Sequence, residues 1–558
     1  MKRYSAFLAV IASAFLLASC SGKVADEPVT PGPDEPVTDE PVADPDWSVY
    51  GKVQCDGTGI PGVVVTDGYL VTTTDENGIY GLISDKKNKM VWISTPSGYR
   101  TAALGVQAQF YQTLTKDAFT GEERNFELVR DKDQTKHTML VFGDMHLAAR
   151  TKDRAQFKTF TADVSDYLSQ HAAENIFALT LGDMTWDQYW YTNSYYFSNY
   201  LSDINEGLKD LTVFHTIGNH DHDMKTSVDG SVKGWNAVDW DTAGAFRNAL
   251  GPNYYSFNIG QVHYVMLDNI FCRNTTGGAA ADRLYDKRVS DDCLAWLKKD
   301  LAYVDKATPV VVSMHSQVYD KDGASSMSSV SSLTACFDGF SDVTFLTGHS
   351  HNIWNVDKGS IKEHNSGAVC ACWWWCGYYD PDVNIAGDGS PAGYRIMSFD
   401  GKNHTSAFKA TGHGPEHQFR SYDRNSIRIS TEGVKYGSQM KEALSSHGGY
   451  NSPGKSNQVI VNVWDWDKNW KVEISENGKP LEVSRFTGYD PLFMIAYYLP
   501  RFKSTEKPSF NANATNHLFS ATASSATSTL EIRVTDDEGR VYTETMTRPK
   551  AFTMETYR

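Results

Sequence analysis

Five short segments of the chain each end an apolar run with side chains that can bind a metal ion. They are Gly143-Asp144-Met145-His146, Gly182-Asp183, Gly218-Asn219-His220-Asp221, His315 and Gly348-His349-Ser350-His351. The preceding runs, residues 139–142, 176–181, 212–217, 309–313 and 343–346, are rich in β-branched or aromatic residues and lack a helical period, which predicts five strands. The carboxyl ends of parallel strands in an α/β sheet open onto a common crevice. We therefore expect these side chains to converge at one edge of a sheet.

The sequence between these segments also favours an α/β fold. Residues 157–168 and 294–301 carry apolar side chains at helical spacing, which predicts crossover helices. Residues 254–259 and 262–267 alternate apolar and polar side chains around Gly260-Gln261, which predicts a hairpin at the edge of a sheet.

The candidate ligands combine imidazole nitrogens with carboxylate and amide oxygens, a set that suits Zn, Fe or Mn and is poor for Ca. Their order, D-x-H, G-D, G-N-H-D, H and G-H-x-H, resembles the calcineurin-like metallophosphoesterase superfamily, which includes the purple acid phosphatases. The resemblance covers residues 136–405. It implies an α/β core in which two sheets form a four-layer αββα sandwich.

The same resemblance implies a site for two metal ions, with Mn, Fe and Zn left open as their identity. It places one metal on Asp144, His146, Asp183 and His351 and a second on Asp183, Asn219, His315 and His349, so that Asp183 bridges them. Two metals about 3.5 to 4 Å apart can clamp a phosphoryl group and lower the pKa of a shared water from ~15.7 towards ~7. The expected reaction is in-line attack of the resulting hydroxide on phosphorus.

The resemblance gives a catalytic role to the two residues that follow Asn219. His220 would stabilise the transition state or protonate the leaving oxygen, and Asp221 would orient the imidazole of His220. One departure from the family concerns the second segment, which is often G-D-x-x-D. Here Asp187 lies one place later than that pattern, so its role is left open.

The N-terminus has the layout of a cleaved secretion signal. Lys2 and Arg3 precede an apolar segment from Ala6 to Leu17 that is too short to span a bilayer, and small residues lead to Cys20. Residues 1–19 resemble a bacterial lipoprotein signal peptide, which implies that Cys20 becomes the lipidated first residue. The alternative is an ordinary secretory signal in which Cys20 is incidental. We expect an extracytoplasmic protein, anchored by lipid to a bacterial membrane on its periplasmic or outer face.

A tether and two β-rich domains surround the core. Residues 20–47 repeat an acidic Pro-rich motif that cannot bury a core, which predicts a spacer. Residues 48–130 carry short strand-like runs and Gly-rich turns and resemble the carboxypeptidase regulatory-like β-sandwich, for which we expect a structural role. Residues 406–558 predict a second all-β sandwich and resemble the C-terminal domain of some bacterial calcineurin-like phosphoesterases.

The chain is acidic, with a formal net charge of −16 and no marked cluster of Lys or Arg. A nucleic-acid-binding protein normally presents a basic face, so no nucleic acid is expected as a partner. Phosphate esters remain compatible with an acidic chain because bound metals supply local positive charge. The oligomeric state is left open.

A cysteine- and tryptophan-rich segment, residues 370–376, follows the last candidate ligands. If it is extended, alternate side chains point to opposite sides, so at least one of Trp373, Trp374 and Trp375 should be exposed. An exposed indole beside the site would stack on a ring of the substrate, and packing against a neighbouring domain is the equal alternative. The thiols of Cys370, Cys372 and Cys376 are expected to be buried or disulfide-bonded, with a structural zinc completed by His364 as the weaker alternative.

Together these features predict a metal-dependent phosphoric ester hydrolase that acts outside the cytoplasm on a phosphate monoester or diester. The sequence does not decide between the two ester classes. The alternative is a catalytically silent surface protein whose β-sandwich domains bind a glycan or a protein. Loss of a ligand would favour that alternative, and the ligand set in this chain is complete.

Overall fold

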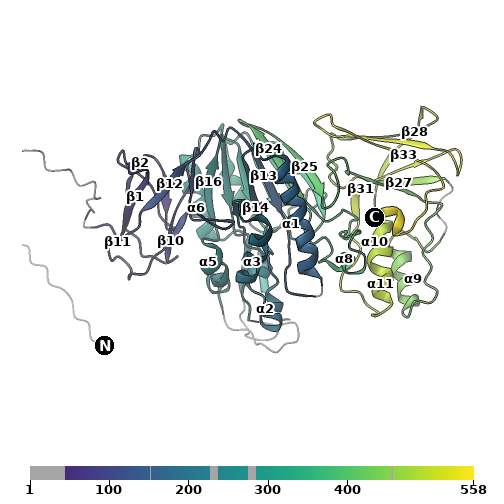
Figure 1. Cartoon of the computed structure of the whole chain (residues 1–558), viewed down its shortest axis with the longest axis horizontal. Helices are drawn as coiled ribbons and strands as arrows, with labels where there is room; N and C mark the ends of the chain where they lie inside the picture. Colours follow the sequence, from purple (N-terminus) through teal and green to yellow (C-terminus); the bar gives the residue numbers. More distant parts are fainter. Residues whose placement is uncertain are drawn as a thin grey trace, which may run out of the picture. The chain divides into compact units, whose positions relative to one another are not determined.

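In the described part of the chain, two β-sheets packed face to face form the centre of the computed structural model (Figure 1). The β13 sheet has the strand order β25-β24-β13-β14-β15-β9-β8, and the β20 sheet has the order β16-β17-β20-β21-β23-β22. Side chains alternate along strand β13: Met139 and Val141 belong to the core between the sheets, whereas Leu140 and Phe142 pack against helices outside it. The predicted four-layer αββα core is therefore confirmed.

The structure describes residues 44, 46–150, 152–225, 237–273, 284–452, 454 and 457–558. The predicted signal segment 1–19, Cys20 and most of the predicted tether 20–47 lie outside these residues. Within the described ranges, no helix is both long enough and apolar enough to cross a membrane.

The core elements follow the apolar runs of the sequence. The β13 sheet contains β8 (Ala103–Leu104), β9 (Gln107–Ala108), β13 (Lys136–Phe142), β14 (Ile176–Thr180), β15 (Val213–Phe214), β24 (Gly393–Asp400) and β25 (Asn403–Ala410). The β20 sheet contains β16 (Tyr255–Ile259), β17 (Val262–Met266), β20 (Val310–Ser313), β21 (Val343–Thr347), β22 (Ile353–Asp357) and β23 (Ile361–Ser366). A separate hairpin pairs β18 (Ile270–Arg273) with β19 (Leu284–Lys287).

Helices cover the outer face of each sheet. Against the β13 sheet lie α1 (Asp153–Gln170), α3 (Phe197–Leu208) and α5 (Gly244–Leu250), and against the β20 sheet lie α6 (Asp291–Asp300) and α7 (Val330–Thr334). Short elements join them: α2 (Asp187–Asn193), α4 (Asp239–Thr242), η1 (Asn219–Asp221), η3 (Leu301–Tyr303) and η4 (Ala335–Phe337). The predicted helices at residues 157–168 and 294–301 correspond to α1 and to α6 with η3.

The five predicted strands exist, but they do not share one sheet. Strands β13, β14 and β15 are parallel neighbours in the β13 sheet, whereas β20 and β21 are parallel neighbours in the β20 sheet. The expectation of a single sheet edge is therefore wrong. The ligand-bearing loops instead follow the carboxyl ends of strands from both facing sheets. The predicted hairpin of β16 and β17 is confirmed, with β16 at the edge of its sheet.

The N-terminal domain is a β-sandwich. Its sheets have the orders β11-β1-β12-β7, with β2 and β5 also paired to β1, and β10-β6-β3-β4. The strands are β1 (Val49–Cys55), β2 (Thr58–Gly59), β3 (Val64–Thr66), β4 (Val71–Thr73), β5 (Ile79–Leu82), β6 (Met90–Ile93), β7 (Tyr99–Thr101), β10 (Tyr111–Thr113), β11 (Glu122–Glu123) and β12 (Phe126–Arg130). Residues of β8 and β9 leave this sandwich and extend the β13 sheet, because Gln107 pairs with Val213 of β15.

The C-terminal part combines β-sheets with helices, so its description as all-β needs correction. The sheets have the orders β26-β27-β31-β30 and β29-β28-β32-β33. Their strands are β26 (Arg420–Asp423), β27 (Gln458–Asn462), β28 (Lys471–Glu476), β29 (Lys479–Pro480), β30 (Ser484–Gly488), β31 (Thr515–Thr522), β32 (Leu530–Thr535) and β33 (Val541–Met546). The helices are α8 (Trp375–Tyr379), α9 (Gly437–Ser446), α10 (Pro491–Phe493), a π-helix (Met494–Tyr498), α11 (Leu499–Phe502) and η6 (Glu555–Tyr557).

The helices between residues 491 and 502 are not predicted from the sequence, and the reason is physical. Residues 491–502 are apolar on nearly every side and buried, so they show no amphipathic period. Their core also takes in Cys372 and Cys376 of the aromatic segment. The segment after the last candidate ligands is thereby built into the C-terminal domain.

Candidate metal centre

Strand ends and the loops after them position all the predicted ligands. Asp144 and His146 follow β13, Asp183 follows β14, and Asn219 opens η1 after β15. His315 follows β20, and His349 and His351 follow β21. All of these side chains except His349 are nearly inaccessible to solvent.

Tight loop conformations turn the ligands inward. Five of the seven predicted ligands have a positive φ, namely Asp144 (43°), His146 (45°), Asp183 (53°), His349 (65°) and His351 (61°). For residues other than glycine this conformation is uncommon, costs on the order of 1–3 kcal/mol, and concentrates at functional sites. Strain of this kind at so many neighbouring positions indicates that the loops are shaped for a ligand.

Asp183 lies at the centre of the cluster. Its Oδ2 atom is 3.4 Å from Nε2 of His146 and 3.3 Å from Nε2 of His315. One carboxylate thus faces an imidazole on each side, which is the arrangement expected of a bridging ligand.

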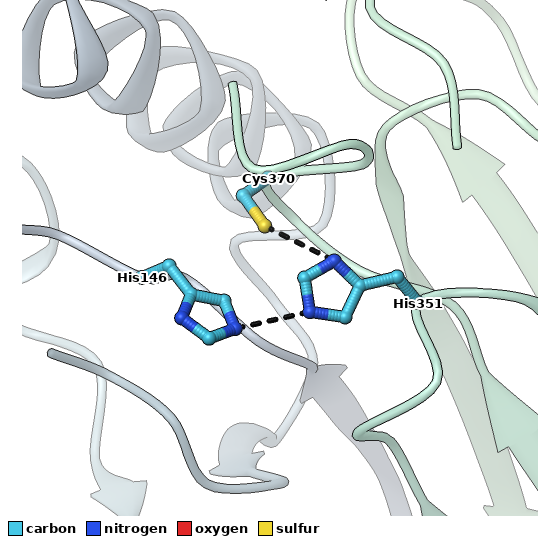
Figure 2. A group of neighbouring side chains, drawn as sticks. All are labelled: His146, His351 and Cys370. Atoms are coloured by element: carbon cyan, nitrogen blue, oxygen red, sulfur yellow. Dashed lines mark hydrogen bonds between the residues drawn. The ribbon is translucent and has the colours of Figure 1, made fainter. Parts of the chain in front are cut away.

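On one side of Asp183 lie Asp144, His146 and His351. Nε2 of His351 is 3.4 Å from Oδ1 of Asp144 and 3.0 Å from Nε2 of His146. Figure 2 shows these two imidazoles facing each other across this gap. The backbone N–H of His349 donates to both oxygens of Asp144 and fixes that carboxylate.

On the other side lie Asn219, His315 and His349. Nε2 of His315 is 2.9 Å from Oδ1 of Asn219 and 3.0 Å from Nδ1 of His349. The structure therefore brings the predicted ligands together in the two groups that the resemblance implies, with Asp183 shared.

Hydrogen bonds behind the rings decide which nitrogens face the centre. Nδ1 of His315 lies 2.7 Å from the Leu181 carbonyl, and Nδ1 of His351 lies 2.6 Å from the Ala371 carbonyl. A carbonyl oxygen only accepts, so each Nδ1 carries the proton and each neutral ring presents a lone pair at Nε2. Metal-binding histidines commonly donate their second N–H in this way.

With these tautomers, hydrogen-bond acceptors of the rings face hydrogen-bond acceptors of neighbouring side chains. In neutral His315, the Nε2 lone pair faces carboxylate and amide oxygens, Oδ2 of Asp183 and Oδ1 of Asn219. Such groups repel each other unless a proton or a cation lies between them. The donor set therefore fits transition-metal ions at both groups, each of which mixes imidazole nitrogen with oxygen.

The pKa values agree with competition between protons and metal ions. Burial holds the pKa of His146 and of His349 well below the usual range, so both rings are neutral, as a ligand must be. Burial also opposes charge on His315, but the Asp183 carboxylate outweighs it and raises the pKa of His315 to about 9. A metal ion on Nε2 would displace that proton.

His220 lies beside the centre, and its partner corrects the sequence-based expectation. Nδ1 of His220 is 2.8 Å from Oδ1 of Asp187, whereas the oxygens of Asp221 accept from the backbone N–H groups of Gly218 and Thr185. Asp187, the first residue of α2, therefore orients the imidazole, and Asp221 holds the loop. The shifted spacing of this second acid had left its role open, and the structure places it against His220.

Cys370 borders the site although sequence reasoning did not assign it there. Its sulfur lies 3.6 Å from Nδ1 of His351, on the side of the ring that faces away from His146 (Figure 2). Nδ1 donates to the Ala371 carbonyl, so Cys370 packs behind the ring and supports it. Cys370, Cys372 and Cys376 are buried and form no disulfide, and Nδ1 of His364 lies against Oδ1 of Asn355 instead of completing a zinc site.

The three tryptophans have different environments because the segment turns instead of extending. Trp373 stacks on His351 with ring centroids 4.0 Å apart and on Phe510 at 3.8 Å, and two rings this close occupy opposite faces of the indole. Trp374 is 3% exposed and donates to the Met145 carbonyl. Neither Trp373 nor Trp374 therefore leaves a ring face open to a substrate. Of these three tryptophans, only Trp375 remains available for stacking.

The fold and the clustered donors define an α/β protein with a candidate site for two metal ions. Family models match the chain in three consecutive parts: residues 47–131 match the N-terminal domain of calcineurin-like phosphoesterase, residues 137–352 match calcineurin-like phosphoesterase, and residues 363–542 match its C-terminal domain. The chain is a calcineurin-like metallophosphoesterase with the N- and C-terminal domains associated with this family.

Solved structures with a similar arrangement are distant in sequence. A dimetal phosphatase from Danio rerio is 11% identical, with 48% of this chain and 98% of that chain covered and a TM-score of 0.31. GAP50, the anchor in the inner membrane complex of Plasmodium, is 12% identical over 50% and 86% of the two chains, with a TM-score of 0.32. PhoD is 11% identical over 72% and 83%, with a TM-score of 0.31. No curated protein matches the sequence.

Proposed function

We propose that the protein hydrolyses a phosphate monoester or diester at a two-metal centre. This proposal rests on the position of Asp183 between two sets of donors. An imidazole nitrogen from each set, Nε2 of His146 and Nε2 of His315, lies close to Oδ2 of Asp183. Two bound metal ions would offset charge on the phosphoryl oxygens and supply a water of low pKa as nucleophile.

The residues of the chain hold this centre and serve the leaving group. Leu181 and Ala371 fix the tautomers of His315 and His351 through their carbonyls. His220 is 17% exposed at its side chain, and its backbone N–H donates to Oδ1 of Asp183. Nδ1–H of His220 is held by Asp187, so Nε2 is left to face the substrate. In the imidazolium form, its N–H would donate to the departing oxygen and could transfer a proton to it.

The alternative of a silent binding protein would be favoured by loss of a ligand, and every predicted ligand is present in the chain. Hydrolysis of p-nitrophenyl phosphate and bis(p-nitrophenyl) phosphate by the chain loaded with Mn, Zn or Fe tests the proposal. We expect turnover of at least one ester and its loss in Asn219→Ala. Absence of turnover with every metal, or full activity of Asn219→Ala, would contradict the proposed function.

We also propose that the enzyme acts outside the cytoplasm, anchored by lipid at Cys20. The support is the sequence of residues 1–20, which lie outside the described residues. Fractionation of cells that express the full chain tests this: the wild type should partition with membranes, and Cys20→Ala should not. Equal partition of both chains would argue against the anchor.

A further inference from the structure

A pocket of about 660 Å³ lies beside the metal centre, and the proposed reaction does not use its walls. They include Arg150 from the loop after β13, Tyr189 of α2, Trp375 and Tyr378 of α8, and Arg501 of α11. The pocket therefore joins the phosphoesterase core, the aromatic segment and the C-terminal domain.

Two guanidinium groups in this pocket share one aromatic ring. The Cζ atom of Arg501 lies 4.7 Å from the centre of the Trp375 ring, and that of Arg150 lies 5.7 Å from it. The indole attracts each cation, but two like charges gathered at one ring also repel each other. An anion bound close to both guanidinium groups would offset this repulsion.

Both arginines have unused hydrogen-bond donors. Among the described residues, the Nε atoms of Arg150 and Arg501 are buried and have no hydrogen-bond partner. The Arg150 side chain is only 11% exposed, and its Nη2 donates to the Trp373 carbonyl. Buried donors of charged groups that lack a partner are costly, and a nearby anion would offset part of that cost.

The pocket carries a net positive charge in an acidic chain. Of the residues that line it, Asp153 is the only acid, against Arg150 and Arg501. The Oδ2 atom of Asp153 lies 3.9 Å from Nε of Arg150 and already accepts the backbone N–H groups of Ala148 and Arg150. The lining therefore holds two guanidinium groups and one carboxylate that is already engaged.

The indole of Trp186 lies between Arg150 of this pocket and the histidines of the candidate metal centre. Cζ of Arg150 lies 4.6 Å from the centre of the Trp186 ring, and that ring lies 5.2 Å from His146 and 5.4 Å from His220. Arg150, which lines the pocket, and two histidines of the candidate metal centre thus contact the same indole ring.

We propose that this pocket is an anion subsite that holds a phosphate or carboxylate on the alcohol portion of the substrate. The assignment of the occupant to the substrate rests on the proposed phosphoesterase function. The substrate class is then a phosphate ester that carries a second anionic group beyond the scissile bond.

Calorimetric titration of the full metal-loaded chain with inorganic phosphate tests the subsite. The wild type should bind two phosphates, one at the metal centre and one in the pocket, and Arg501→Gln should bind one. Arg501→Lys, which keeps the charge, should retain the second site with weaker affinity, and unchanged circular dichroism shows that the variants are folded. If the metal centre does not bind phosphate, the wild type should bind one phosphate and Arg501→Gln none. A failure at the metal centre therefore gives a different result from a failure of the subsite.

Arg485 provides the matched control. It also packs on a tryptophan of the C-terminal domain, with Cζ 4.1 Å from the centre of the Trp466 ring, but it does not line the pocket. Arg485→Gln should bind phosphate like the wild type. Equal phosphate counts for the wild type and Arg501→Gln, or an equal loss in Arg485→Gln, would overturn the subsite.

A pair of substrates tests whether the anion belongs to the substrate. The ratio of kcat/KM for 3- or 4-carboxyphenyl phosphate to that for phenyl phosphate should fall about tenfold in Arg501→Gln. If the second phosphate is lost in this variant and neither ratio changes, the pocket binds a separate anion, and the substrate assignment is wrong.

Discussion

The role of each histidine depends on which of its ring nitrogens faces the centre of the site. His315 and His351 each donate Nδ1–H to a backbone carbonyl, which leaves Nε2 facing the centre. His220 directs Nδ1 to Asp187 instead. The first two rings are thereby suited to bind metal, and the third is suited to meet the substrate.

Asp187→Asn should lower kcat about ten- to a hundredfold, because the amide removes the negative charge that holds the proton on Nδ1 of His220. KM and the bound metal should change little, since Asp187 is not among the ligands. Steady-state kinetics with p-nitrophenyl phosphate and elemental analysis measure both. Asp166→Asn on the exposed face of α1 is the control. Wild-type kcat in Asp187→Asn would remove the orienting role.

Metal affinity should depend on pH through His315. The pKa of His315 is raised to about 9, so below that pH the ring carries a proton that a metal ion must displace. The association constant should therefore rise about tenfold per pH unit from pH 6 to 8, and flatten above the pKa. Calorimetric titrations with Mn²⁺ across this range measure the slope. A flat profile would show that His315 is not a ligand.

At the scale of elements, the turns after the strands shape the centre. Gly182 precedes Asp183 with a φ of +89°, and a Cβ there would lie 2.7 Å from Cα of Gly218 and from Nδ1 of His315. Backbone conformation and crowding together therefore require glycine at this position.

Gly182→Ala should lower the free energy of unfolding by about 2–5 kcal/mol, from backbone strain and overpacking, and should weaken metal binding by displacing His315. Gly57→Ala is the matched control, because Gly57 also has a positive φ of +76° but no atom near the added Cβ. It should cost only about 1 kcal/mol. Urea denaturation and metal titration compare the two variants, and equal effects would contradict a role for crowding at Gly182.

The elements also show what sequence reasoning can reach. The strands before the ligands are predicted because their runs are apolar and β-branched, and the ligands are predicted because they follow those runs. The division of these strands between two sheets is not predicted, because the hydrophobic pattern of a strand does not determine which strand pairs with it. The contact between Asp187 and His220 is not predictable, because it depends on where α2 begins. The position of Cys370 behind His351 depends in the same way on how its segment turns.

At the scale of the molecule, a buried ion pair ties the core to the C-terminal domain. Arg395 of β24 binds Asp465 through two hydrogen bonds of 2.7 and 3.1 Å, and both side chains are at most 3% exposed. Asp465 also accepts the backbone N–H of Phe408 in β25. Packing of this domain keeps the aromatic segment and its Ala371 carbonyl in place behind His351.

Asp465→Ala should lower the free energy of unfolding by about 3–5 kcal/mol, because it leaves the Arg395 charge buried without its partner. The control is Glu206→Ala, which removes the partner of Lys158 in a pair whose side chains are both 60% exposed and should cost at most about 1 kcal/mol. Urea denaturation measures both. A loss for Asp465→Ala no larger than that for Glu206→Ala would show that the buried pair does not hold the domains together.

The most direct test of a two-metal phosphoesterase is titration of the metal-free chain with Mn²⁺ while the hydrolysis of a phosphate ester is followed. The rate should rise to a plateau at two ions per chain, and Asp183→Ala, which lacks the shared carboxylate, should show no comparable rise. Full activity in the presence of a chelator, a plateau at one ion per chain, or two bound ions without any hydrolysis would contradict the assignment.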